Sequence, residues 1–261
     1  MPSQPMFKQI NSSVSLHKPV AVLFDIDNTL YEYEPADEAG NSALREEVKS
    51  LLQIPEKLYD TAFQQARQKV KERLADTASG HSRLLYIQKS LEILGLKSKP
   101  LLSLYLEEIY WRAYFQKVTL FPGALETFEL LRAWDIPLGI VTDLTTRLQL
   151  RKLVYLNLEH YFDVVVTSEE TGADKPDVSN FELALSKLQL NKDSGQIWMI
   201  GDDTESDVLG GKTIGAVTFQ KLCEDANIEQ DKASPDFAFT DFRALNEFVE
   251  NSVAGYSPTE Q

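Results

Sequence analysis

The hydrophobic pattern divides the chain into a region of helical periodicity and a region in which strands and helices alternate. The first strong signal is an uninterrupted apolar run at 20–24, which is typical of a buried strand. After Leu30, four stretches separated by Pro or Gly place apolar residues three or four positions apart, at 35–52, 55–74, 81–94 and 100–116. We predict that these stretches form a small helical bundle.

From Leu120 onward, predicted helices and strands alternate. Apolar runs of strand length occur at 137–141, 164–167, 197–200 and 216–219. Helical patterns precede or separate them, at 123–134, 145–156, 178–188 and 206–214. Such alternation predicts a parallel sheet with crossover helices, and the first strand most simply joins this sheet. The expected fold class is therefore α/β, a Rossmann-like parallel sheet with an inserted all-helical cap.

The same patterns predict how the chain is divided. We expect a core domain formed by 19–31 and 119–250, with 32–118 inserted after the first strand as the helical cap. The stretch 1–18 is polar and Ser-rich without an apolar centre, so we expect no secretory signal but a leader, either disordered or a packed arm. The last residues, 251–261, are expected to form a frayed tail.

Composition narrows the classes of partner. The chain has 40 acidic and 26 basic residues and a net charge of -14, which argues against a nucleic-acid polymer, because phosphate backbones bind Lys/Arg-rich surfaces. No apolar run approaches the roughly 20 residues that span a bilayer, so we expect no membrane partner. The single cysteine, Cys223, fits a reducing compartment. We expect a cytoplasmic protein that is a monomer or homodimer.

Polar side chains follow four of the predicted strands. They are, in chain order, Asp25, Asp27, Thr142, Asp143, Lys175, Asp202, Asp203 and Asp207. In open α/β sheets ligands bind outside the carboxyl ends of the strands, so we expect these groups to converge. Asp25 and Asp27 would point to one side at strand period, and such close anions repel unless a cation or a proton intervenes. Carboxylates, a hydroxyl, an ammonium and a hard cation predict a site for a phosphoryl group.

Asp25, Thr142, Lys175 and Asp202, in this order at four strand ends, resemble the four motifs of the haloacid dehalogenase superfamily. The resemblance extends from the first predicted strand to the helix after the last motif and includes the helical insertion. It implies that Asp25 is the nucleophile, which forms an aspartyl-phosphate, and that Asp27 is the general acid and then the base. Thr142 and adjacent backbone would hold the phosphoryl oxygens, and Lys175 would neutralise nucleophile and phosphate.

The resemblance also implies a Mg²⁺ ion. Its ligands would be the Asp25 carboxylate, the Asp27 backbone carbonyl and Asp202, with Asp203 or Asp207 in or behind the coordination sphere. Asp203 and Asp207 would also suit the start of a helix, where carboxylates cap backbone N–H groups and complement the macrodipole.

Asp27 favours phosphoryl transfer over carbon–halogen cleavage, because the dehalogenases of this superfamily lack a second Asp two residues after the nucleophile. Asp143 replaces the Asn that is frequent after the motif-two Thr, and it either binds substrate or orients the loop. Arg83, at the start of a cap helix, is expected to be solvated rather than to bind an anionic substrate group.

We therefore predict a Mg²⁺-dependent phosphatase that hydrolyses a small phosphorylated metabolite of the nucleoside monophosphate or sugar phosphate type. Two alternatives remain open. One is a phosphomutase with the same motifs, and the other is a non-enzymatic, phosphorylatable binding or signalling module.

Overall fold

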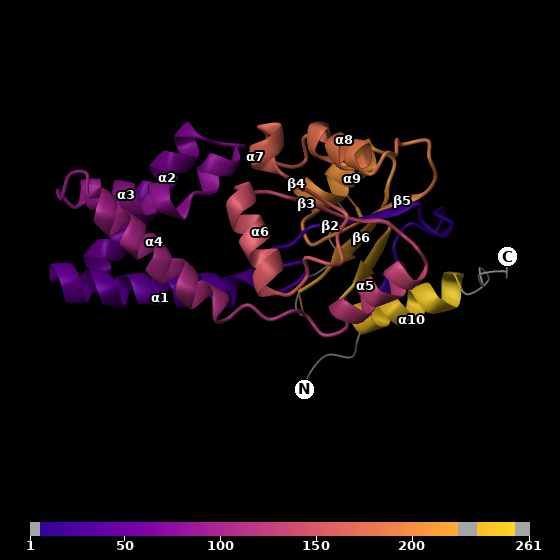
Figure 1. Ribbon diagram of the computed structural model, residues 1–261, viewed down its shortest axis with the longest axis horizontal. Coiled ribbons are helices and arrows are strands. Elements are labelled where there is room, and N and C mark those ends of the chain that lie inside the picture. The colour runs from indigo at the N-terminus through magenta and orange to yellow at the C-terminus, as the bar shows by residue number, and fades with distance from the viewer. Residues whose placement is uncertain (1–5, 224–233, 254–261) are drawn as a thin grey trace.

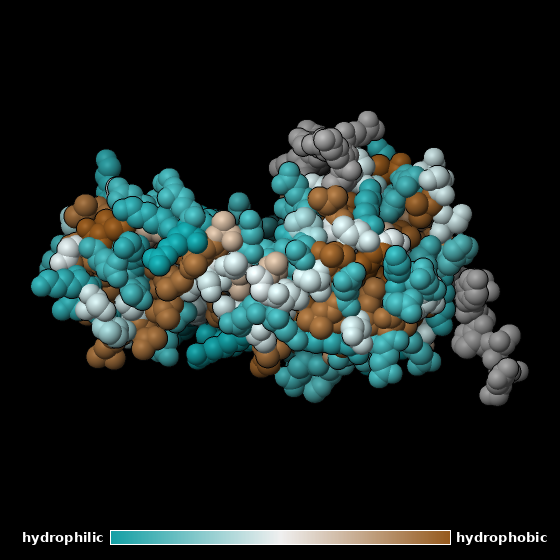
Figure 2. All heavy atoms as spheres, turned by 90° about the horizontal axis from the view of Figure 1, so that it is seen from above, coloured by the Kyte–Doolittle hydropathy of each residue, from teal (hydrophilic) through white to brown (hydrophobic). Residues whose placement is uncertain are grey.

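The computed structural model describes residues 6–223 and 234–253. It has two lobes, a helical lobe formed by α1–α4 and an α/β core (Figure 1). Seen from above, the surface is largely hydrophilic and the two lobes are joined by a narrower middle (Figure 2). Within the described ranges, no helix is long and apolar enough to cross a membrane.

The core contains one seven-stranded sheet in the order β1-β7-β6-β5-β2-β3-β4. Its strands are β1 (Phe7–Gln9), β2 (Ala21–Phe24), β3 (Leu138–Thr142), β4 (Val164–Thr167), β5 (Ile197–Gly201), β6 (Val217–Lys221) and β7 (Phe237–Phe239). Neighbouring strands are parallel except for the antiparallel pair of β1 and β7. The interior strand β2 is completely buried, which explains its uninterrupted apolar sequence. The predicted α/β class with a parallel sheet is confirmed.

Helices cover both faces of the sheet because alternate strand residues point in opposite directions. Val22 and Phe24 of β2 belong to an apolar cluster that includes residues of α5 (Ala124–Ala133) and α10 (Phe242–Val253). Leu23 belongs to the cluster on the other face. Figure 1 shows α5 and α10 below the sheet and α8 and α9 above it. The remaining core helices are α6 (Thr146–Tyr155), α7 (Ser168–Thr171), α8 (Val178–Lys187) and α9 (Leu209–Thr213).

The cap, as we call the helical lobe, follows β2 directly. Its elements are α1 (Tyr33–Leu52), α2 (Glu56–Arg73), the 3-10 turn η1 (Ala78–His81), α3 (Arg83–Ile93) and α4 (Pro100–Phe115). The four predicted cap helices are confirmed, with small shifts at their ends. Gly40 lets α1 approach α4 closely, since a Cβ at this position would lie 2.5 Å from Tyr110 Cε2.

Two linkers join the lobes and lie side by side. Phe121 N donates a hydrogen bond to Leu30 O at 2.8 Å, and Tyr31 forms isolated β-bridges with Asp27 and Leu120. Tyr31 is completely buried. The chain therefore leaves the core for the cap within a few residues of Asp27.

A second contact joins the cap to the loop that precedes α8. Asp174 N donates to Asp76 O at 3.0 Å, and His81 Nε2 lies 3.1 Å from Asp174 Oδ2. Lys175 is the next residue of this loop. The η1 region of the cap thus contacts the loop that positions Lys175.

The strands β1 and β7 and the helix α10 were not predicted. β1 lies in the expected leader, so residues 7–9 form a packed strand, whereas 1–5 lie outside the described residues. The expected tail at 251–261 begins later than predicted, because α10 extends to Val253. Residues 254–261 lie outside the described residues. The division into core and cap domains remains a prediction.

Candidate active site

The predicted polar residues meet at the carboxyl edge of the sheet. Asp25 follows β2, Thr142 ends β3 and Asp202 follows β5, and these three strands are neighbours at the sheet centre. Lys175 comes from the loop after α7, and Asp207 comes from the turn η2 (Thr204–Val208). The topology therefore gathers side chains that lie far apart in the sequence.

Lys175 lies between two carboxylates. Its Nζ is 2.7 Å from Asp25 Oδ1 and 2.6 Å from Asp207 Oδ1, and all three side chains are buried. Burial by itself would lower the pKa of Lys175, but Asp207 and Asp25 raise it well above its ordinary value. The ammonium therefore remains charged and offsets part of the negative charge at the site.

Three carboxylates form a potential cation site. Asp25, Asp202 and Asp207 each present an oxygen, and these oxygens all lie within 4.8 Å of one another. Burial, together with the nearby Asp25 carboxylate, raises the pKa of both Asp202 and Asp207. A divalent cation would relieve this repulsion, and carboxylate oxygens are the ligands that Mg²⁺ prefers. The donor set therefore fits Mg²⁺.

Asp203 and Asp207 differ in their surroundings. Asp203 Oδ1 accepts hydrogen bonds from Glu205 N at 2.7 Å and Ser206 N at 2.9 Å, so it caps the turn η2. Asp207 belongs to the carboxylate triad, and its Oδ2 accepts from Asp203 N at 3.1 Å. Of the two residues that the sequence offered, Asp207 presents an oxygen beside those of Asp25 and Asp202, and Asp203 caps the turn from which Asp207 comes.

Gly201 makes room for Asp207, because a Cβ at Gly201 would lie 2.2 Å from Asp207 Oδ2. We predict that Gly201→Ala displaces this carboxylate and destabilises the fold by about 1–3 kcal/mol, the usual range for overpacking a core. The measurement is thermal unfolding with and without Mg²⁺. We expect a smaller Mg²⁺-induced rise in Tm for the variant, and an unchanged response would contradict this role of Gly201.

Asp27 lies beside the triad in a separate cluster. Lys152 Nζ is 2.7 Å from its Oδ1 and 2.6 Å from its Oδ2. Tyr31 Oη donates to Oδ1, and Gln149 Nε2 lies 3.4 Å from Oδ2. Burial would raise the pKa of Asp27, but the Lys152 ammonium and these hydrogen bonds lower it overall. In this arrangement the carboxylate form of Asp27 is stabilised.

Sequence reasoning missed Lys152 and Gln149, although both are completely buried. A signal was present. The buried positions of α6 are Leu148, Gln149, Lys152 and Leu153, which form the inward stripe of an amphipathic helix. Lys is almost never fully buried unless it is paired. A Lys and a Gln within an otherwise apolar stripe therefore indicate a buried polar partner.

The residues at the end of β3 are held by α6 and by the Lys175 loop. Thr142 Oγ1 accepts from Gln149 Nε2 at 2.9 Å, and Asp143 Oδ1 accepts from Lys175 N at 2.9 Å. Burial raises the pKa of Asp143 to about 6. The backbone contact favours the loop-orienting alternative for Asp143.

The cap approaches Asp27 through Tyr114 of α4, whose hydroxyl oxygen is 2.6 Å from that of Tyr31. Further into the cap, Arg83 is buried, and its NH2 donates to Asp37 Oδ1 at 2.7 Å. Arg83 Nε also donates to Tyr110 Oη at 3.0 Å. The expectation of a solvated Arg83 is therefore wrong, because the cap supplies a carboxylate and a hydroxyl for its guanidinium.

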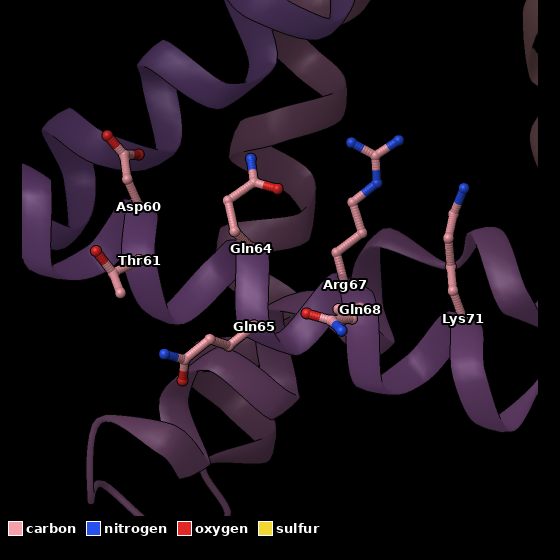
Figure 3. A pocket seen from close by; sticks show the side chains of 7 residues that line it. All are labelled: Asp60, Thr61, Gln64, Gln65, Arg67, Gln68 and Lys71. Atoms are coloured by element: carbon pink, nitrogen blue, oxygen red, sulfur yellow. The ribbon is translucent and has the colours of Figure 1, made fainter.

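Two hollows lie on the cap or between the cap and the core. A cleft of about 410 Å³ is lined by residues of α3 and α4 in the cap, among them Leu104 and Trp111, and by Leu144 and Thr145 of the core. These two core residues directly follow Thr142 and Asp143 in the sequence. A larger hollow of about 680 Å³ lies on α2, where polar side chains surround it (Figure 3). No residue of the carboxylate triad lines either hollow, but the cleft between cap and core reaches the residues that follow Asp143.

Comparison with known proteins extends over most of the chain. The family of haloacid dehalogenase-like hydrolases matches residues 20–215. Ribulose-1,5-bisphosphate 5-phosphatase of Halopiger xanaduensis is 39% identical over 199 residues, which are 76% of this chain and 82% of that protein. Glyceraldehyde 3-phosphate phosphatase of Methanopyrus kandleri is 28% identical over 233 residues, 88% of this chain and 96% of that protein. A solved HAD phosphatase from Thermococcus onnurineus superimposes with a TM-score of 0.66 at 27% identity, covering 88% of this chain and 97% of that chain.

Proposed function

This chain belongs to the haloacid dehalogenase-like hydrolases, and from that premise we propose that it is a Mg²⁺-dependent phosphatase of small phosphorylated metabolites. The supporting observation is the grouping of Asp25 with Lys175, Asp202 and Asp207 at the carboxyl edge of the sheet. Asp27, two residues after Asp25, supplies the proton-transfer group that ester hydrolysis needs. The reaction class is phosphoric monoester hydrolysis.

The substrate that we propose is a sugar phosphate. Two of the relatives are named for the phosphorylated carbohydrates ribulose 1,5-bisphosphate and glyceraldehyde 3-phosphate. The cleft of about 410 Å³ between cap and core has the size of a small-molecule site. Nucleoside monophosphates are the second class, because pyrimidine 5'-nucleotidase YjjG of Escherichia coli is 36% identical over 113 residues, 43% of this chain.

In the first chemical step, a carboxylate oxygen of Asp25 attacks phosphorus, and the bond between phosphorus and the alcohol oxygen breaks. The Asp27 carboxyl group gives its proton to the departing alcohol. The arriving phosphate dianion favours this acid form of Asp27, since a nearby anion disfavours a carboxylate. Thr142 and the neighbouring backbone N–H groups hold the phosphoryl oxygens.

In the second step, Asp27 accepts a proton from water as the water oxygen attacks phosphorus, which releases inorganic phosphate and regenerates Asp25. Lys175 holds Asp25 in place and offsets negative charge in both steps. A Mg²⁺ ion held by Asp25, Asp202, Asp207 and the Asp27 carbonyl would neutralise charge on the transferring phosphoryl group. We further propose a cytoplasmic location, which the single cysteine supports, and a monomer or homodimer.

We expect phosphate release to depend on metal. The panel is ribulose 1,5-bisphosphate, glyceraldehyde 3-phosphate, glucose 6-phosphate, UMP and p-nitrophenyl phosphate. EDTA should lower the rate by about 100-fold or more, since Lys175 offsets only part of the negative charge of the buried carboxylates and the phosphoryl group. Added Mg²⁺ should restore it. Inorganic phosphate is measured over many turnovers.

The same assay separates the rival functions. A phosphomutase would keep the phosphoryl group on an organic product, so inorganic phosphate would not accumulate. A phosphorylatable module would release at most one equivalent per chain. Either result, or turnover that persists in EDTA, would contradict the proposed function.

A further inference from the structure

Lys152 is a completely buried cation that the proposed mechanism does not use. It lies on α6, and its Nζ contacts both carboxylate oxygens of Asp27, at 2.7 and 2.6 Å. Among the described residues, Asp27 is the carboxylate with which it forms an ion pair. Taking an ammonium group out of water is unfavourable, and good geometry with its partner is needed to offset that cost. The pair is therefore a defined contact rather than an incidental surface interaction.

The surroundings of Asp27 restrain its side chain without enclosing it. Lys152 and Gln149 approach from α6, and Tyr31 donates from the linker. The side chain of Asp27 is still 24% exposed, so part of it faces open space. The donors thus determine the orientation of the group, and its exposed part remains accessible to a reacting molecule.

We propose that Lys152 is a positioning residue for Asp27, which holds the carboxyl group where it can exchange a proton with the leaving oxygen of the substrate. The proposal rests on the proposed phosphatase function. Proton transfer from a side chain requires hydrogen-bond reach to the reacting atom, and a displacement of about 1 Å can cost roughly 100-fold in rate. Because the ion pair that Lys152 forms in the described part of the chain is with Asp27, we expect it to act through this carboxyl group.

A purely structural role for Lys152 makes a different prediction. Loss of a buried ion pair that only stabilises the fold would lower the activity on all substrates by the same factor. Loss of positioning would lower the activity mainly on those substrates whose leaving alcohol needs a proton. The leaving group of glycerol phosphate is a strongly basic alkoxide, which needs a proton in order to depart. The leaving group of p-nitrophenyl phosphate is a weakly basic phenolate, which can depart without being protonated.

The test measures kcat/KM for these two esters with Lys152→Met, because kcat/KM reports the steps up to departure of the alcohol. We expect the glycerol phosphate value to fall at least about tenfold more than the nitrophenyl value, and by no more than the roughly 10²–10⁴-fold that general acid catalysis contributes. Lys152→Arg keeps the charge and should recover part of the difference. Lys49→Met is the matched control, since it removes an exposed ion pair of 2.7 Å to Glu56 on the cap and should change neither value.

A double-mutant cycle with Asp27→Asn separates the positioning role from a loss of folded protein in the Lys152→Met variant. If Lys152 acts through Asp27, Lys152→Met added to Asp27→Asn will not change the ratio of the two kcat/KM values any further. The double variant also removes both charges of the buried pair, so no buried charge is left unpaired. A further change of the ratio in the double variant would overturn the proposal.

The outcomes for the two proposals differ. If the wild-type chain fails to release phosphate from any ester with Mg²⁺, the phosphatase function itself is wrong. If the wild type is active and Lys152→Met lowers both values equally, or leaves both unchanged, only the positioning role is overturned. Where Lys152→Met does not yield folded protein, Lys152→Arg and the double variant provide the same comparison of leaving groups.

Discussion

Replacing Asp25 by Asn is expected to abolish phosphate release and to leave the fold intact. The amide oxygen is a poor nucleophile, and loss of a covalent nucleophile costs several orders of magnitude, so we expect a fall of about 10⁴-fold or more in kcat. Asn retains an oxygen that can accept the hydrogen bond from Lys175 Nζ, now 2.7 Å from Asp25 Oδ1. It also removes one of three crowded carboxylates, so Tm should change by only a few degrees.

The control for this variant is Asp177→Asn, the same change in the N-terminal cap of α8. Asp177 Oδ1 accepts from Ser179 N at 2.9 Å, and Asn caps a helix about as well as Asp, so activity and Tm should match the wild type. The proposed nucleophile would be wrong if Asp25→Asn retained more than a few per cent of the wild-type kcat in a preparation free of wild-type enzyme.

The second large effect is expected for Lys175→Met, in both stability and activity. Without the ammonium, Asp25 and Asp207 would remain buried near each other with no cation between them. Breaking a buried ion pair by removing one partner costs about 3–5 kcal/mol in unfolding free energy. Because Lys175 also offsets charge during phosphoryl transfer, kcat should fall by about 10²–10³-fold. Urea unfolding in EDTA, followed by kinetics with Mg²⁺, measures both effects.

Mg²⁺ provides an internal check on this prediction. A divalent cation among the carboxylates would partly replace the missing positive charge, so Mg²⁺ should raise the Tm of Lys175→Met by more than it raises that of the wild type. Lys187→Met serves as the comparison, because its 2.6 Å ion pair with Glu170 lies near the surface and should contribute only about 0.2–1 kcal/mol. Equal losses for the two lysine variants would contradict the role of Lys175.

The sheet was predictable where the apolar pattern is simple. A strand with both faces buried, such as β2, reads as a continuous apolar run, and the cap helices show clear helical spacing. β1 and β7 are three-residue strands at one side of the sheet, and so short a segment contains too few positions for a periodic signal. β1 depends on pairing with β7, more than 200 positions away in the chain, which no local pattern reveals.

The candidate site was predictable to the extent that its residues follow strands. Asp25, Thr142 and Asp202 end neighbouring parallel strands, so sheet topology alone brings them together. Lys152 projects from a helix, and its meeting with Asp27 depends on how α6 packs rather than on strand order. The choice between Asp203 and Asp207 likewise depended on the conformation of the turn η2, since both residues fit the sequence pattern equally well.

The contact between the η1 region and the Lys175 loop limits which caps could replace the present one without disturbing the site. Asp174 is bound through its backbone to Asp76 O and through its side chain to His81, and both partners belong to the cap. A cap grafted from a relative to alter the substrate range would have to reproduce both partners, or the loop beside the nucleophile would lose two supports. We therefore expect that, in chimaeras of this fold, a grafted cap that changes the substrate range will also change the reaction rate.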